Sequence, residues 1–90
     1  MCLGIPMQVV DVEGYEARCE ARGIERRVNL FLLQDETIQQ GDHVLVHIGY
    51  AIQKLDEDDA KDRWEVLEQM IQMMPELAED FPEFASALAG

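Results

Sequence analysis

The sequence predicts a mainly β protein, a small closed or half-closed β-barrel followed by a C-terminal α-helix. Short apolar stretches separated by turn signals fill the first 55 of the 90 residues, which is too little chain for a β-sandwich of any size. At Asp56 the spacing of the apolar residues changes from alternation to a helical period. Ninety residues also supply only one hydrophobic core, so we expect a single domain.

Three strands are expected in the first third of the chain. Residues 5–11 are apolar and rich in β-branched side chains, which favours a strand. Residues 15–21 and 24–30 flank the pair Arg22-Gly23, and two such stretches around a glycine-containing pair are typical of a hairpin. Residues 1–55 are therefore interpreted as the barrel, with a cysteine-bearing tip at its N-terminus.

The second half of the barrel is less regular in sequence. In residues 28–33, Val28, Leu30 and Leu32 alternate with Asn29, Phe31 and Leu33, so we expect this stretch to be buried on both faces at its end. The polar stretch 34–42 ends in a Gly-Asp pair, a turn signal. Residues 43–52 alternate again, and Gly49 interrupts them, which predicts a bulge or a bend.

Residues 56–74 have the pattern of an acidic amphipathic helix packed on the barrel. Asp56 is a candidate N-cap, and the acidic first turn after it suits a helix N-terminus. One apolar face is expected, consisting of Ala60, Trp64, Leu67, Ile71 and Met74 and widened by Val66, Met70 and Met73. The alternative to packing is a Met-rich face that binds in a groove of another protein.

Pro75 is expected to end this helix. Residues 75–90 form a C-terminal extension of the same domain in this interpretation. A second short helix is predicted within it, with an apolar side made of Leu77, Phe81, Phe84 and Leu88.

The charge is strongly negative and unevenly distributed. The formal net charge is −12, and residues 56–90, with eleven acidic and two basic side chains, account for −9 of it. Phosphate backbones repel such a chain, so nucleic acid is not expected as a partner. No apolar run is long enough to span a membrane or to form a signal peptide, and two cysteines make no disulfide framework. We therefore expect a cytoplasmic protein with reduced thiols and no membrane partner.

Few residues offer chemistry. Cys2 places a thiol at a chain end, where core packing is least expected, and a thiolate is a soft ligand for iron or copper. His43 and His47 alternate with apolar residues as in a strand, where four residues span roughly 13 Å, too far for one metal ion. No Ser/His/Asp set, phosphate loop or acid–base carboxylate pair is present, so an independent enzyme is not supported.

Two stretches make the chain resemble the HypC/HupF family of NiFe-hydrogenase maturation chaperones. The first is MCLGIP at residues 1–6, and the second is GDHVLVHIGYA at residues 41–51. The similarity in layout extends over roughly residues 1–74. It departs from the usual family pattern at Met7-Gln8, where many members have Gly, and in the residues after 74. Both departures resemble features of specialised paralogues that serve one hydrogenase. They concern the identity of the partner more than the basic activity.

The resemblance implies an OB-like barrel and a non-enzymatic role. Chaperones of this family bind the iron–sulfur scaffold protein HypD, hold an Fe(CN)2CO fragment and escort it to the large-subunit precursor of the hydrogenase. The family's N-terminal cysteine, exposed after removal of Met1, matches Cys2 and would hold the iron. The family's histidine in the VHxG segment matches His47, as a second ligand or a positioning group, whereas His43 has no counterpart role.

Two other classes of function stay open at this stage. The chain would also suit an interaction protein that masks or holds open the hydrogenase precursor, with Cys2 contacting that partner but carrying no iron. An independent barrel that binds a small molecule is the third class. Iron with cyanide and carbon monoxide ligands would distinguish the carrier from the masking protein.

Overall fold

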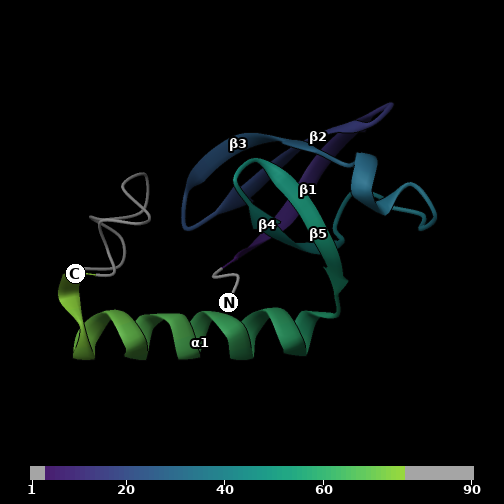
Figure 1. Cartoon of the computed structure of the whole chain (residues 1–90). Coiled ribbons are helices and arrows are strands. Elements are labelled where there is room, and N and C mark those ends of the chain that lie inside the picture. The colour runs from purple at the N-terminus through teal and green to yellow at the C-terminus, as the bar shows by residue number, and fades with distance from the viewer. Residues whose placement is uncertain (1–3, 77–90) are drawn as a thin grey trace.

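The computed structural model describes residues 4–76 and confirms a mainly β protein, a closed barrel followed by one α-helix (Figure 1). Its elements are β1 (Ile5–Glu13), β2 (Glu16–Ala21), β3 (Ile24–Asn29), the 3-10 turn η1 (Phe31–Leu33), β4 (His43–His47), β5 (Tyr50–Leu55) and α1 (Glu57–Met73). Around the barrel the strands follow the order β1, β2, β3, β5, β4, and β4 closes it by pairing with β1. All neighbours are antiparallel except β3 and β5, which are parallel.

Three tight hairpins build most of the sheet, and Gly14-Tyr15 connects β1 to β2. Arg22-Gly23 connects β2 to β3, as the sequence predicts. The bulge or bend expected at Gly49 is wrong: Ile48-Gly49 is a further hairpin turn, and His47 pairs with Tyr50 across it. Both residues of this turn have positive φ, the conformation that a type I′ hairpin turn requires. The irregularity in this hairpin lies instead on β5, between the partners of Leu45 and Val46.

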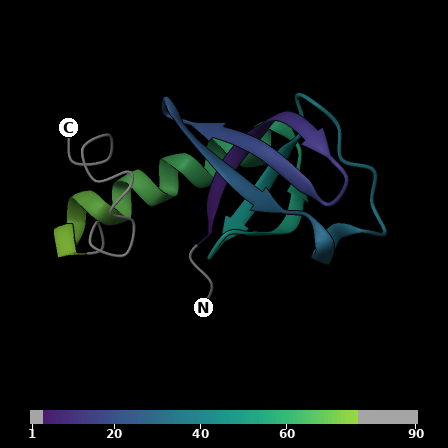
Figure 2. The ribbon, with the colours of Figure 1, turned by 90° about the horizontal axis from the view of Figure 1, so that it is seen from above.

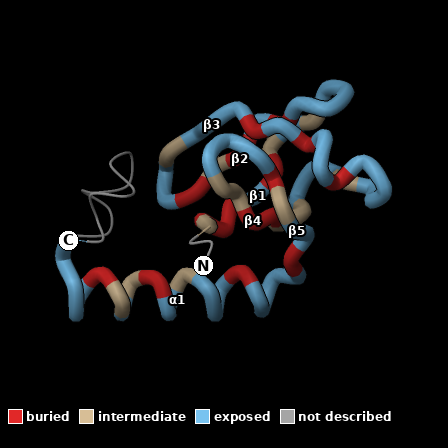
Figure 3. The backbone as a smooth tube through the Cα atoms, viewed as in Figure 1, coloured by how far each residue is buried: buried red, intermediate tan, exposed pale blue. Residues whose placement is uncertain are grey.

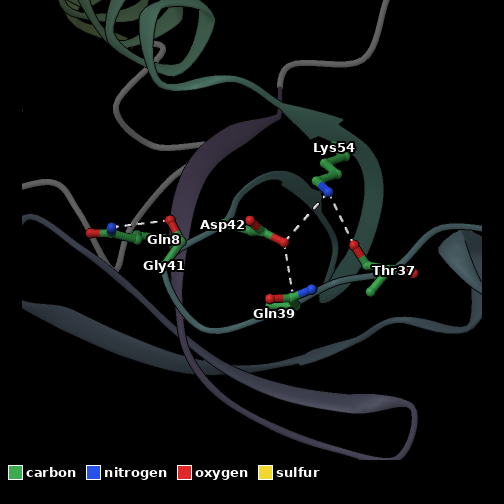
Figure 4. A network of polar contacts seen from close by, with 6 residues as sticks. All are labelled: Gln8, Thr37, Gln39, Gly41, Asp42 and Lys54. Carbon is green, nitrogen blue, oxygen red and sulfur yellow. Dashed lines mark hydrogen bonds and ion pairs between the residues drawn. The ribbon is translucent and has the colours of Figure 1, made fainter.

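The loop between η1 and β4 is fixed by the polar network drawn in Figure 4. The Lys54 Nζ donates a hydrogen bond to the carbonyl of Thr37 at 3.0 Å and lies 3.6 Å from a carboxylate oxygen of Asp42. The side-chain amide of Gln8 donates to the carbonyl of Gly41 at 3.2 Å. The Gly-Asp pair of the second sequence stretch therefore has a structural role, because it ties the loop to β1 and β5 before β4 begins.

The expected burial of residues 28–33 on both faces is wrong. Leu30 and Leu33 are buried, but Phe31 and Leu32 are exposed. The strand ends at Asn29, whose side-chain oxygen accepts a hydrogen bond from the N–H of Phe31 at 2.7 Å and so starts a 3-10 turn. In this turn the alternation of a strand no longer applies, so two apolar side chains point to the solvent.

The predicted helix is present and packs on one side of the barrel (Figure 1). Asp56 caps it, since its carboxylate accepts a hydrogen bond from the N–H of Asp59 at 2.8 Å. Ala60, Leu67 and Ile71 are buried against the strands, as Figure 3 shows by the red segments of the helix. These three residues lie on the apolar face that the sequence predicts.

The far end of the expected apolar face is not buried. Met74 is 49% exposed and Met73 is 82% exposed, because the C-terminal part of α1 projects beyond the barrel (Figures 1 and 2). Val66 is also exposed, on a different side of the helix from the buried residues. The second helix predicted within residues 75–90 falls almost entirely outside the described residues.

Candidate functional site

His47 is the last residue of β4 and lies at the barrel end where β1 begins. β1 and β4 are antiparallel, with Ile5 opposite Val46. Continuing this register by one residue places Gly4 opposite His47, and Figure 2 shows the start of β1 beside the end of β4. The imidazole is half-buried and does not belong to the hydrophobic core. The fold thus brings Gly4, the first described residue, next to His47.

Gly4 is required by a close contact at this end of the barrel. A Cβ atom on Gly4 would lie 2.6 Å from Cγ of Leu45, closer than such atoms approach one another. Leu45 is buried in a small cluster with Leu55 and Ala60, under the first turns of α1. The missing side chain lets the backbone at Gly4 lie directly on Leu45 at the start of β1.

Pro6 provides a second anchor for the same segment. It sits in β1 before the pairing with β2, which begins at Gln8, so the missing N–H of proline removes no bond to β2. Its carbonyl accepts a hydrogen bond from the indole N–H of Trp64 at 2.8 Å. The guanidinium of Arg22 lies over the Trp64 ring, 4.7 Å from its centre. Strand β1, helix α1 and the β2–β3 turn therefore meet around Pro6.

A groove of about 380 Å³ opens beside Gly4, between β4 and α1. It is lined by Gly4, Leu45, Asp59, Asp62, Arg63, Val66, Leu67 and Met70. Sequence reasoning missed this groove, because it depends on how α1 lies across the end of the barrel. The available signal was the charged set at 59, 62 and 63, which follows the helical period on the flank of the apolar stripe.

His43 lies at the opposite end of β4 and does not join His47. The strand that the alternation predicts is present, so four residues, or roughly 13 Å, separate the two histidines. His43 lines a different depression, together with Gln8 and Glu57. Within residues 4–76 no group of three or more His, Cys, Asp or Glu side chains is placed to hold a metal ion.

Cys19 is the thiol that the described structure contains, and it is a core residue. It is fully buried in β2, and this burial raises the pKa of its thiol to about 11. The thiol is therefore protonated at neutral pH, whereas a metal ligand or a nucleophile must be a thiolate. Cys2 lies outside the described residues, so its position relative to His47 stays a prediction. In the part of the chain that the structure covers, no helix has the length and apolar character needed to cross a membrane.

A comparison with protein families matches residues 1–67 to the model of the HupF/HypC family. The matched range contains both Cys2 and His47 and extends from the first residue into α1. It covers well over half of the 90 residues.

Curated relatives show the same similarity. The chain is 48% identical over 61 residues to the hydrogenase expression/formation protein HupF of Bradyrhizobium diazoefficiens, covering 68% of this chain and 60% of that protein. It is 40% identical over 77 residues to the hydrogenase maturation factor HypC of Helicobacter hepaticus, covering 84% and 88% of the two chains. The HypC of Escherichia coli is 36% identical over 81 residues, covering 86% and 90%.

Proposed function

The chain belongs to the HupF/HypC family, and we propose that it acts in hydrogenase maturation as an iron-carrying chaperone. Two of the relatives above are named hydrogenase maturation factors, and the third is named a hydrogenase expression/formation protein. The cargo in this proposal is an Fe(CN)2CO fragment. It is taken from a HypD-type iron–sulfur scaffold protein and delivered to the precursor of the NiFe-hydrogenase large subunit. The cargo is passed on and is not a resident cofactor of this chain.

The observation that carries the proposal is the register of β1 against β4. It places Gly4 opposite His47 and holds Gly4 on Leu45. Cys2 is two residues before Gly4, so the covalent chain keeps their Cα atoms within roughly 7 Å of each other. This chain length allows a thiolate at Cys2 and an imidazole at His47 to bind the same iron atom.

This pair of ligands suits a carrier. A thiolate binds iron firmly, and an imidazole is a good ligand for the same metal. Closed four-ligand sites hold structural metals permanently, whereas a site with few protein ligands leaves positions for cyanide, carbon monoxide and a receiving protein. The half-buried position of His47 at the end of a strand gives access from outside the barrel.

The test is to purify the protein without oxygen from cells that make the maturation proteins, and to measure iron content and the infrared bands of cyanide and carbon monoxide. Cys2→Ser is expected to lose nearly all iron, because a serine hydroxyl stays protonated at neutral pH. His47→Ala is expected to lower iron content several-fold while the thermal unfolding midpoint stays close to that of the wild type. His43→Ala is the matched control at the other end of the same strand and is expected to load iron normally.

A different result would favour the masking protein. Wild-type protein that is repeatedly free of iron, shows no cyanide or carbon monoxide bands and still binds the large-subunit precursor would replace the carrier by a chaperone that only holds the precursor. A Cys2→Ser variant that loads iron and supports maturation like the wild type would also contradict the proposed role of the thiol.

A further inference from the structure

Ile48 combines two unfavourable features in one residue. Its φ is 50°, in the left-handed region that β-branched residues almost never adopt, because their side chain collides with the backbone. Its side chain is also 82% exposed, so almost no apolar surface is removed from water. Asn, Asp or Gly would satisfy the first position of this hairpin turn without strain.

The turn between β2 and β3 shows how such a conformation can be compensated. Arg22 occupies the equivalent position between β2 and β3, with φ 54°. Its guanidinium stacks on Trp64 and pairs with Glu68, so the turn fastens the barrel to α1. Ile48 contributes to neither hydrophobic cluster of the described residues. Contacts within the described residues therefore do not compensate for the strain at Ile48, and a contact with another molecule would do so.

Ile48 lies on one of three neighbouring turns that carry exposed apolar side chains, and we call this set of side chains the Ile48 patch. Its members are Tyr15, Phe31, Leu32, Ile48 and Tyr50, each between 45% and 82% exposed. Backbone contacts fix the turns that carry them: the N–H of Asn29 donates to the carbonyl of Gly49, and that of Leu30 donates to the carbonyl of Tyr15. The rings of Tyr15 and Phe31 meet edge to face, 5.8 Å apart.

Acidic side chains outnumber basic ones around the patch, although Glu16 lies 3.9 Å from the guanidinium of Arg27. Glu13 and Glu16 flank the β1–β2 turn, and Asp35 and Glu36 follow η1, all of them exposed. At the other end of the patch, Tyr50 pairs directly with His47. A protein that receives the Cys2 tip next to His47 would therefore also cover Ile48 and Tyr50.

We propose that the Ile48 patch is the docking surface for the protein that meets the Cys2 tip, and that this partner offers an apolar pocket bordered by Lys and Arg side chains. Ile48 enters the pocket, and the acidic residues around the patch face the basic border. This inference rests on the proposed function, from which it takes the occupant: the HypD-type scaffold protein, since iron loading comes before delivery. The preformed turn then holds Ile48 in place before binding, which reduces the entropy lost in the complex.

The test measures binding of the metal-free chain to the purified scaffold protein by calorimetry. Ile48→Gly removes the side chain and relieves the strain, so its thermal unfolding midpoint should equal or exceed that of the wild type. Its dissociation constant should nevertheless rise at least tenfold. Ile48→Asn, which also suits the turn, should behave in the same way. Leu32→Ser leaves the turn unchanged and should weaken binding several-fold.

Arg22→Asn is the matched control, because it relieves the same strain in the β2–β3 turn. It loses the contacts with Trp64 and Glu68, so it should unfold at a lower temperature but bind the scaffold protein within twofold of the wild type. Wild-type affinity should fall as salt is added, since the acidic border is exposed.

Two results would overturn the inference. One is wild-type affinity in both Ile48 variants and in Leu32→Ser. The other is a wild-type chain that does not bind the scaffold protein at all. Neither result would decide the iron-carrying function, because iron content and infrared bands test that function separately.

Discussion

At the scale of single residues, Gly4 allows the backbone at the start of β1 to lie against Leu45. Gly4→Ala would bring a Cβ atom to 2.6 Å from Cγ of Leu45, and Leu45 can move only by disturbing its cluster with Leu55 and Ala60. We expect the free energy of unfolding to fall by about 1–3 kcal/mol, as in other overpacked sites. Urea denaturation followed by circular dichroism measures this change.

A double-mutant cycle with Leu45 identifies the cause. Leu45→Ala alone removes buried side-chain volume and should cost about 2–5 kcal/mol. In the double variant the methyl group added at position 4 occupies part of the space that Leu45 leaves, so the loss should be clearly smaller than the sum of the two single losses. If the losses in the free energy of unfolding are additive, the contact with Leu45 is not the reason why position 4 requires glycine.

At the scale of secondary-structure elements, Trp64 joins α1 to the barrel. Its indole N–H donates to the carbonyl of Pro6, and its ring contacts the guanidinium of Arg22. Trp64→Phe keeps a ring but leaves the Pro6 carbonyl without this donor and weakens the contact with Arg22. We expect a loss of about 1–3 kcal/mol in the free energy of unfolding, measured by urea denaturation.

The same variant should reveal the helix as the element that loosens. Hydrogen exchange should become faster in α1 and at the start of β1, while the hairpin of β2 and β3 keeps its protection apart from its turn. Protection that decreases equally in all strands would mean that Trp64 stabilises the barrel as a whole and does not act as a link between α1 and β1.

The sequence predicts elements well where the signals are local. Asp56 as N-cap, the spacing from Ala60 to Ile71, and Arg22-Gly23 as a turn depend on neighbouring residues alone, and all three are found in the structure. The Ile48-Gly49 hairpin is missed because isoleucine is a strand residue by preference, and the conflict with its turn conformation appears only in three dimensions.

At the scale of the whole molecule, the site depends on packing that no local pattern contains. His47 is recognised through a family motif, but its place opposite Gly4 follows from the closure of the barrel by β1 and β4. The groove beside Gly4 requires α1 to cross the end of the barrel, and the Ile48 patch brings together three turns that are far apart in sequence. Hydrophobic periodicity indicates which face of an element is buried but not which elements meet.

The acidic C-terminal extension is expected to affect partner binding more than folding. Deleting residues 75–90 removes four acidic and no basic side chains, so the formal net charge changes from −12 to −8. Among the described residues the buried core extends no further than Ile71, so the truncated chain should fold and keep its thermal unfolding midpoint within a few degrees. Its affinity for the scaffold protein and for the large-subunit precursor should change unequally, because a charged extension acts on partners according to their own charge. If the truncated chain binds each partner with the same affinity as the full chain, the extension has no part in recognition. A truncated chain that fails to fold would instead place Phe81 and Phe84 in the core and move the boundary of the folded domain beyond Pro75.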